Sequence, residues 1–318
     1  MKKDRILIVN HHGIGDNIMM TPSIRALKRS QHDAEIYLLV SGEYAAVKDL
    51  WSTNPYVTNT FVSKIPFHPR FWNPVIFYFK DYPLIKKEAY ELAREVKASK
   101  VFIIRQQYFP EFLEKRIPFL PKHRVDRIAY ELKVELEDFY YDIFPQEQHY
   151  KRAQLFLNKY HLEGEHLIGL HTMPSNAGSR TWKLKHVKVL TEYLHSEYGY
   201  KFIHFHSKKS YYLEKSLKST SLDSRYVYST YQENGEELDI LTVAVLAKKC
   251  ELVIAIDSAI AYIANAVNTP LILLCNPKNP YKERIPKQGI VFGIDKEDFL
   301  PDDILSKTVE VLNKLCKT

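Results

Sequence analysis

Three short stretches of the sequence combine charged or hydroxyl side chains with the glycines and strand ends at which proteins bind ligands. In the first, Gly13 and Gly15 precede the carboxylate of Asp16 and leave room for a ligand beside it. His11 and His12 flank this loop and are minor candidates for contact with a bound group. The Gly-x-Gly-Asp spacing lacks the last glycine of a dinucleotide fingerprint and the Gly-Lys-Ser/Thr ending of a P-loop. The motif therefore indicates neither a dehydrogenase nor a P-loop NTPase.

The second stretch, residues 172–182, gathers hydroxyls, an amide and a guanidinium in one loop after a predicted strand. Arg180 could hold a diphosphate through a forked, charge-assisted contact, and Ser175 or Asn176 could donate hydrogen bonds to its oxygens. The alternative is an exposed loop in which Arg180 pairs with a surface carboxylate. These residues alone leave both interpretations open.

The third stretch runs from a predicted buried strand, residues 251–256, into a predicted helix, residues 259–267. Asp257 stands at the carboxyl end of the strand, and Ser258 can cap the helix. A carboxylate at this position can bind sugar hydroxyls while the positive end of the helix takes a phosphate. Asp257 could equally serve only as a helix cap, so this stretch also allows two interpretations.

Short apolar strands alternate with helical segments in both halves of the chain, which predicts parallel sheets. The 318 residues are enough for two such domains. We therefore expect an α/β protein with two Rossmann-like domains whose parallel sheets face a central cleft. The expected divisions are an N-terminal domain at 1–150, a C-terminal domain at 151–300, and a last helix within 301–318 that packs back on the first domain. In the first helix we expect Ile24 and Leu27 to face the core and Arg25 to face water.

The net charge and the cysteine content of the chain indicate what kinds of partner, disulfide and metal site to expect. The formal net charge is +7, which fits either an anionic partner or a solvated basic surface. Cys250, Cys275 and Cys316 are far apart, and the dispersed His, Cys and Asp residues show no metal-ligand spacing. We therefore expect no disulfide framework, no metal site and a reducing compartment.

Neither a signal peptide nor an apolar run long enough to span a membrane is found in the sequence. We expect a soluble, cytoplasmic protein. The segment 61–83 is rich in proline and aromatic residues and is longer than an ordinary connection, so we expect a functional excursion or a lid there. The many aromatic residues between Tyr56 and Tyr150 fit either loop packing over a core or an acceptor-binding, membrane-proximal surface. The second possibility would place the protein peripherally at the inner membrane.

Taken together, the three stretches resemble glycosyltransferase family 9, the ADP-heptose:lipopolysaccharide heptosyltransferases, which have the GT-B fold. The resemblance covers most of the chain by the order and spacing of its motifs. The residues that carry it are Gly13, Gly15, Asp16, Thr21, Pro22, Ala26, Leu27, Lys28, Ile168, Gly169, Leu170, His171, Ser175, Arg180, Trp182, Asp257 and Ser258.

The resemblance implies an inverting, metal-independent transfer of a heptose or related sugar to lipopolysaccharide or another cell-surface glycan. Asp16 would be the general base that deprotonates the acceptor hydroxyl in the N-terminal, acceptor-binding domain. Arg180, with Ser175 and Asn176 beside it, would stabilise the leaving diphosphate. Asp257 and Ser258 would bind the donor in the C-terminal domain. No cofactor is implied beyond the donor itself, a nucleoside-diphosphate sugar for which ADP is one candidate nucleotide.

The third motif departs from the family pattern. Where the family has a glycine and a histidine, this chain has Ala259 and Tyr262, which would then belong to the donor site. A tyrosine can bond a phosphate or a hydroxyl but carries no imidazolium charge. The main alternative is a catalytically degenerate GT-B protein that binds a nucleotide-sugar or glycan without transfer, and a weaker one is a sugar-nucleotide epimerase. The expected partners are a nucleotide-sugar and a glycan or glycolipid acceptor, with no nucleic acid.

Overall fold

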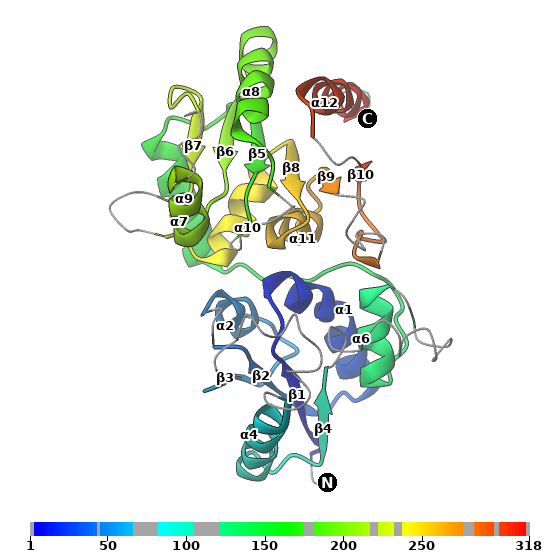
Figure 1. The fold of residues 1–318 in the computed structure, drawn as a ribbon. Helices are drawn as coiled ribbons and strands as arrows, with labels where there is room; N and C mark the ends of the chain where they lie inside the picture. The colour runs from blue at the N-terminus through cyan, green and yellow to red at the C-terminus, as the bar shows by residue number, and fades with distance from the viewer. Residues whose placement is uncertain are drawn as a thin grey trace. The chain divides into compact units, whose positions relative to one another are not determined.

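The computed structural model describes residues 3–42, 45–65, 82–104, 121, 123–174, 181–216, 222–231, 237–275, 283–295 and 299–315. The chain divides into two compact units (Figure 1). Unit 1 comprises Met1–Phe144 and Lys282–Arg284, and unit 2 comprises Pro145–Tyr281 and Ile285–Thr318. The boundary at Pro145 lies slightly before the expected division at residue 150.

Unit 1 is built on a parallel sheet with the strand order β3-β2-β1-β4. Leu7 and Val9 of β1 pack with Ile85 and Ala89 of the helix α4 in one apolar cluster. Ile6, which points to the other face of β1, is also fully buried, so both faces of this strand are covered. The described elements of unit 1 are β1 (Arg5–Asn10), α1 (Ile14–Ser30), β2 (Glu35–Val40), α2 (Ala45–Ser52), β3 (Asn59–Val62), α4 (Tyr82–Glu95), β4 (Lys100–Ile103) and α6 (Arg124–Leu132).

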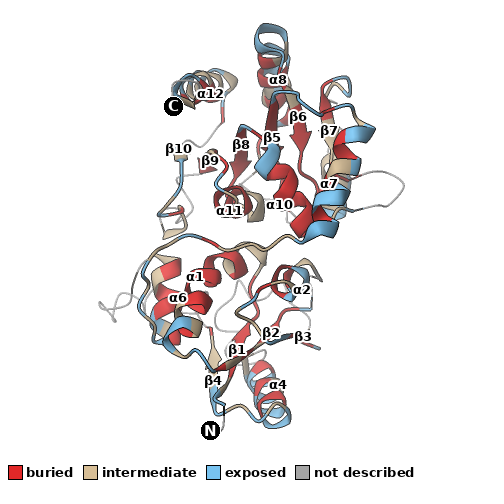
Figure 2. Ribbon diagram, turned by 180° about the vertical axis from the view of Figure 1, so that it is seen from behind, coloured by how far each residue is buried: buried red, intermediate tan, exposed pale blue. Residues whose placement is uncertain are grey.

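Unit 2 is built on a larger parallel sheet with the strand order β10-β9-β8-β5-β6-β7. The central strands β5, β6 and β8 are largely buried, as their red colour in Figure 2 shows, whereas the edge strand β10 is partly exposed. Its described elements are α7 (Glu147–Lys159), β5 (Leu167–His171), α8 (Leu184–Tyr198), β6 (Lys201–His204), α9 (Lys208–Ser216), β7 (Val227–Ser229), α10 (Ile240–Lys249), β8 (Leu252–Ile256), α11 (Ala259–Ala266), β9 (Leu271–Cys275), β10 (Val291–Asp295) and α12 (Pro301–Leu315). The expectation of an α/β fold with two parallel sheets is confirmed.

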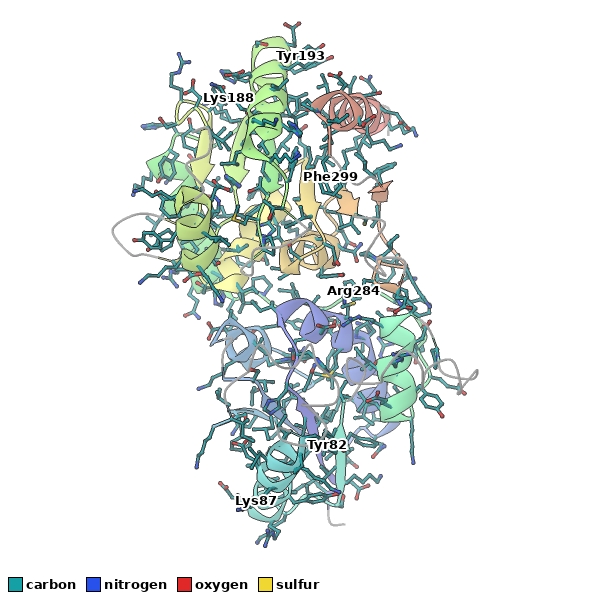
Figure 3. The ribbon with its side chains drawn as sticks, viewed as in Figure 1. Tyr82, Lys87, Lys188, Tyr193, Arg284 and Phe299 are labelled. Carbon is teal, nitrogen blue, oxygen red and sulfur yellow. The ribbon has the colours of Figure 1, made fainter. Side chains whose placement is uncertain are left out.

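The last helix, α12, packs within unit 2, so the expectation that it packs on the first domain is wrong. Its Ile304 and Val311 join Val187 and Leu190 of α8 in one buried cluster. Nδ1 of His186 on α8 also lies 2.8 Å from the carbonyl oxygen of Phe299, just before α12. Figure 3 labels Phe299 below α12. The helix has an apolar face that α8 covers, and this contact determines where it lies.

Arg25 of α1 is buried, so the expectation that it faces water is wrong. Its guanidinium pairs with Asp138 and Asp142, and one of its nitrogens donates to the carbonyl oxygen of Tyr140 at 3.0 Å. These partners are more than a hundred positions away in the sequence. The helical period alone places an arginine on the polar side, because it contains no information about distant carboxylates.

Most of the expected excursion at 61–83 falls on residues 66–81, which lie outside the described residues. No helix among the residues described is long and apolar enough to cross a membrane.

Candidate functional site

The first loop connects the end of β1 to the start of α1, and Gly13 is the residue that precedes the helix. A Cβ atom built on Gly13 would meet no heavy atom of the described structure within 4 Å. Packing therefore does not require a glycine here, and the open space beside the backbone favours the close approach of a ligand. The first turn of α1 lies at the same place, and the first turn of a helix favours an anion because its backbone N–H groups have no partner within the helix.

Asn17 holds this loop together with a set of side-chain hydrogen bonds. Its Nδ2 donates to the carbonyl oxygens of His12 and Gly13, each at 3.0 Å. Its Oδ1 accepts from the indole Nε1 of Trp51 at 3.0 Å and from Nδ2 of Asn10 at 3.3 Å. Asn17 is fully buried, so these bonds form in a low-dielectric setting and fix the loop firmly.

Asp16 lies in the first turn of α1 and pairs with Arg124, the first residue of α6. The guanidinium Nη1 of Arg124 donates to Oδ1 of Asp16, and the two side chains are only 12% and 13% exposed. Burial by itself would raise the pKa of Asp16, but the charges of Arg124, His12 and Arg284 outweigh burial and lower it. Asp16 is therefore an ionised carboxylate in a largely buried setting, which is the form that a general base requires.

The two histidines of the loop differ in their surroundings. Nε2 of His12 lies 3.3 Å from the carbonyl oxygen of Ile104, and its backbone N–H donates to Oδ1 of Asn10. His11 is 3% exposed, and within the described part of the chain neither of its ring nitrogens has a hydrogen-bond partner. Burial and the neighbouring His12 lower the pKa of His11 to about 3, so its ring is neutral near pH 7.

The expected diphosphate site falls outside the described residues. Ser175, Asn176 and Arg180 all belong to the segment 175–180. The two ends of that loop are described, and the backbone N–H of Trp182 donates to the carbonyl oxygen of Thr172 at 2.8 Å. Trp182 is fully buried in the core of unit 2, so this hydrogen bond joins Thr172 to a residue of the core.

The third motif lies at the carboxyl end of β8 and the start of α11, as expected. Asp257 is 5% exposed, and its Oδ1 accepts a hydrogen bond from the Tyr262 hydroxyl at 2.8 Å. Ser258 precedes α11 without a capping hydrogen bond from its side chain. Its Oγ is buried and finds no partner among the residues that the structure describes. Ala259 begins the helix and is half-buried. The Ser258 hydroxyl is thus left available for a ligand at the N-terminus of α11.

Two residues of the first site could not be found from the sequence. Arg124 is 108 positions from Asp16, and only the packing of α6 near the start of α1 brings the two together. Asn17 stood next to the motif, but its role depends on Trp51, which lies 34 positions away.

A buried group of His204, His206 and Glu214 in unit 2 was also missed by the sequence analysis, although the His-x-His spacing is visible in the sequence.

The sequence model of the family described as Glycosyltransferase family 9 (heptosyltransferase) matches residues 165–290, which lie almost entirely in unit 2. No curated protein is significantly similar to the sequence.

Solved structures similar to this chain include several glycosyltransferases. A glycosyl transferase family 9 protein from Veillonella parvula has a TM-score of 0.67 and 17% identity, covering 98% of this chain and 90% of that one. E. coli ADP-heptose lps heptosyltransferase II has a TM-score of 0.68 and 18% identity, covering 98% of both chains. E. coli heptosyltransferase WaaC with ADP-2-deoxy-2-fluoro heptose has a TM-score of 0.59 and 17% identity, covering 96% of this chain and 99% of that one. At these identities the structural matches support the shared fold, and the family match supports the assignment of residues 165–290.

Proposed function

We propose that this chain transfers a heptose or related sugar from a nucleoside-diphosphate sugar to a cell-surface glycan such as lipopolysaccharide. The match of the glycosyltransferase family 9 model to residues 165–290 and the fold shared with E. coli heptosyltransferase II support this proposal. The observation that carries this proposal is the ionised, largely buried Asp16 beside the open backbone at Gly13. A carboxylate that only stabilised the helix would not need such space beside it.

In the proposed reaction, Asp16 accepts the proton of an acceptor hydroxyl. The hydroxyl oxygen forms a bond to the anomeric carbon of the sugar, and the bond from that carbon to the diphosphate breaks with inversion. Arg124 keeps Asp16 ionised and thereby also makes it a weaker base, because a lower pKa means a lower proton affinity. The proton therefore moves late, after the attacking oxygen has become acidic.

The donor is assigned to unit 2, which carries the family match. Arg180, Ser175 and Asn176 are proposed to stabilise the leaving diphosphate. Asp257 and Ser258 are proposed to bind the donor, supported by the carboxylate position at the end of β8 and by the buried Ser258 hydroxyl. ADP-heptose is the first donor to test, since the structure of E. coli heptosyltransferase WaaC contains ADP-2-deoxy-2-fluoro heptose.

The hydrogen bond between Tyr262 and Asp257 favours one second candidate function. It occupies an oxygen of Asp257 from within the protein, so the donor has one less acceptor to use. A protein of this kind could bind a nucleotide-sugar or a glycan without transferring the sugar. Both a non-catalytic protein and the enzyme would bind a nucleotide, but only the enzyme would transfer a sugar.

The test combines donor binding and turnover on the full chain. Thermal unfolding is measured with ADP, GDP, UDP and CDP and their sugars, because a ligand at one hundred times its dissociation constant stabilises a protein by about 2.7 kcal/mol. We expect one nucleotide to raise the melting temperature of the wild type and of Arg225→Ala, an exposed control in unit 2, but not of Arg180→Ala. Failure of every nucleotide would overturn the donor assignment.

Turnover is then measured with the donor that binds and extracted glycolipid acceptors. Asp16→Asn should retain donor binding and lose roughly 10²–10⁴-fold in kcat. Asp49→Asn, which changes an exposed carboxylate of α2, should behave as wild type. Nucleotide binding without transfer would support the second candidate, and donor conversion without any acceptor would identify an epimerase instead.

A further inference from the structure

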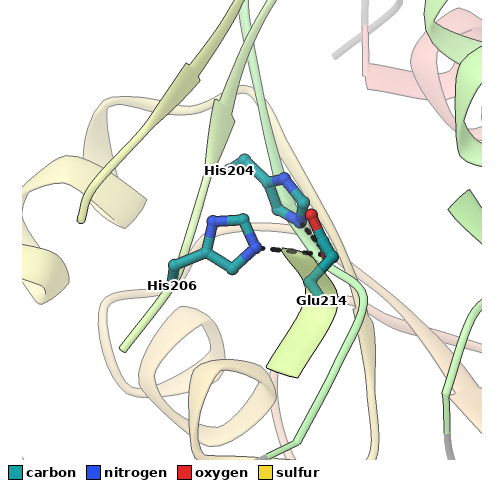
Figure 4. A group of neighbouring side chains, drawn as sticks. All are labelled: His204, His206 and Glu214. Atoms are coloured by element: carbon teal, nitrogen blue, oxygen red, sulfur yellow. Dashed lines mark hydrogen bonds and ion pairs between the residues drawn. The ribbon is translucent and has the colours of Figure 1, made fainter. Parts of the chain in front are cut away.

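Unit 2 contains a buried group of two imidazoles and one carboxylate beside the ends of neighbouring strands. His204 is the last residue of β6, and His206 follows two positions later, so the two side chains leave the strand on the same side. Glu214 comes from α9, and Figure 4 shows its carboxylate directed toward the two rings. The side chains of His204 and His206 are each 3% exposed, and that of Glu214 is 13% exposed.

The spacing of the three ligand atoms matches a single metal ion. Oε2 of Glu214 lies 3.3 Å from Nε2 of His206 and 3.9 Å from Nε2 of His204. The three atoms all lie within 4.8 Å of one another. With bonds of about 2.0–2.1 Å and tetrahedral angles, two ligand atoms on Zn²⁺ are roughly 3.3–3.4 Å apart. To share a Zn²⁺ ion with Glu214 at these bond lengths, the His204 ring would have to move roughly half an ångström closer to it, whereas His206 already lies at the required spacing.

Neighbouring side chains orient this group as outer-shell residues do in known metal sites. Nδ1 of His206 shares a hydrogen bond with Oγ of Ser229 at 2.9 Å, which leaves its Nε2 directed at Glu214. The Thr172 hydroxyl donates to Oε2 of Glu214 at 3.0 Å and lies 2.9 Å from Nε2 of His204. Such contacts fix the ring orientation and the position of a carboxylate ligand.

The three side chains also offer donor types that divalent transition metals bind, namely imidazole nitrogen and carboxylate oxygen.

We propose that His204, His206 and Glu214 bind one divalent transition-metal ion, with Zn²⁺ as the ion whose preferred ligands and tetrahedral geometry fit best. The ion would tie α9 to the carboxyl end of β6. This differs from the sequence-based expectation that the chain holds no metal. The proposed transfer reaction does not use these three residues. The metal site and the proposed function can therefore be tested, and can fail, independently.

The test uses the full chain without a polyhistidine tag, stripped of metal with a chelator and then desalted. Zn²⁺ is titrated in competition with a chromophoric chelator, and the metal content is measured after a second desalting. Co²⁺ is added in a parallel titration, because its visible absorption reports tetrahedral coordination. The variants are Glu214→Gln and His206→Gln, with Thr172→Val for the outer shell. His166→Gln is the control, since it removes an imidazole of unit 2 that is 70% exposed.

We expect one Zn²⁺ per chain for the wild type and for His166→Gln. Thr172→Val should weaken the affinity roughly 10–100-fold, and the loss of a ligand in Glu214→Gln or His206→Gln should weaken it further. Circular dichroism checks that the variants fold. If His206→Gln does not fold, the Zn²⁺ affinities of Glu214→Gln and Thr172→Val decide whether this group binds the ion. The proposal is overturned if the wild type keeps no stoichiometric ion, or if Glu214→Gln binds Zn²⁺ as tightly as the wild type. The group would then be a hydrogen-bonded network only.

Discussion

The guanidinium of Arg124 donates to the carboxylate of Asp16 across 108 positions of sequence. One partner begins α6 and the other lies in the first turn of α1, so the pair joins the starts of two helices of unit 1. Both side chains are mostly buried, which makes their charges more strongly coupled than on an open surface. The pair therefore controls the protonation of the residue that we propose as the general base.

Replacing Arg124 with glutamine should move the acid limb of the activity profile to higher pH. Burial would still raise the pKa of Asp16, while the cation that chiefly lowers it would be gone. A base must be deprotonated to act, so activity should be lost at a higher pH as the pH falls. The measurement is kcat/KM against pH for Arg124→Gln, with the exposed Arg94→Gln of α4 as control. An unchanged acid limb would show that Arg124 does not set the charge of Asp16.

The same pair should contribute to stability in a pH-dependent way. Because the folded-state pKa of Asp16 is lowered, its contribution is present above the ordinary aspartate pKa and is lost as the pH falls through the folded-state value. In Arg124→Gln this contribution should be absent at neutral pH as well. Urea unfolding of wild type and variant at neutral and acidic pH should therefore show a stability difference that shrinks as the pH falls.

Asn17→Ala should destabilise unit 1 and reduce activity together. The change leaves the buried indole N–H of Trp51 without its acceptor and removes the side-chain bonds to the carbonyl oxygens of His12 and Gly13. The Gly13 carbonyl keeps the bond from the backbone N–H of residue 17. The expected loss of unfolding free energy is about 2–4 kcal/mol, measured by urea denaturation. Asn59→Ala is the matched control, since Asn59 is exposed and accepts one local backbone hydrogen bond. Equal stability of the two variants would contradict the role assigned to Asn17.

Tyr262→Phe should weaken donor binding and cost about 1 kcal/mol of stability. The hydroxyl that is removed donates to the buried Asp257, and without it the carboxylate loses a bond that orients it. Nucleotide affinity and thermal stability are measured side by side. Tyr228→Phe removes a hydroxyl that donates to the backbone carbonyl of Arg225, so it controls for the loss of an exposed bond. Tighter donor binding in Tyr262→Phe would mean that Tyr262 competes with the donor for Asp257.

Arg25→Met should be far more damaging than Arg29→Met, although both arginines belong to the same helix. The Arg25 side chain is 8% exposed and pairs with two carboxylates, Asp138 and Asp142. Removing it leaves those charges unpaired in a partly buried setting, for which about 3–5 kcal/mol is typical. Arg29 is 46% exposed and pairs with the exposed Glu137, so its loss should cost at most about 1 kcal/mol. Urea unfolding of the two variants measures the difference, and similar midpoints would contradict it.

The sequence by itself determined the class of fold and the motif that leads to Asp16. Strands such as β1 and β8 are continuous apolar runs, and each is followed directly by a loop and a helix. The strand and the candidate site residues that follow it are therefore close together in the sequence. Local backbone preferences and burial patterns act over this range, which is why they can be found from the sequence.

Only the tertiary structure decided which distant side chains complete each local group. It buried Arg25 against two carboxylates, placed Arg124 beside Asp16, and packed α12 on α8. It also brought Glu214 of α9 to His204, which ends β6, and to His206, two residues further on. Hydrogen bonds and ion pairs between distant segments depend on how helices pack on the sheets, and no periodicity along the chain encodes that packing. The sequence determines the elements, and their packing determines the charge and the partners of the residues they carry.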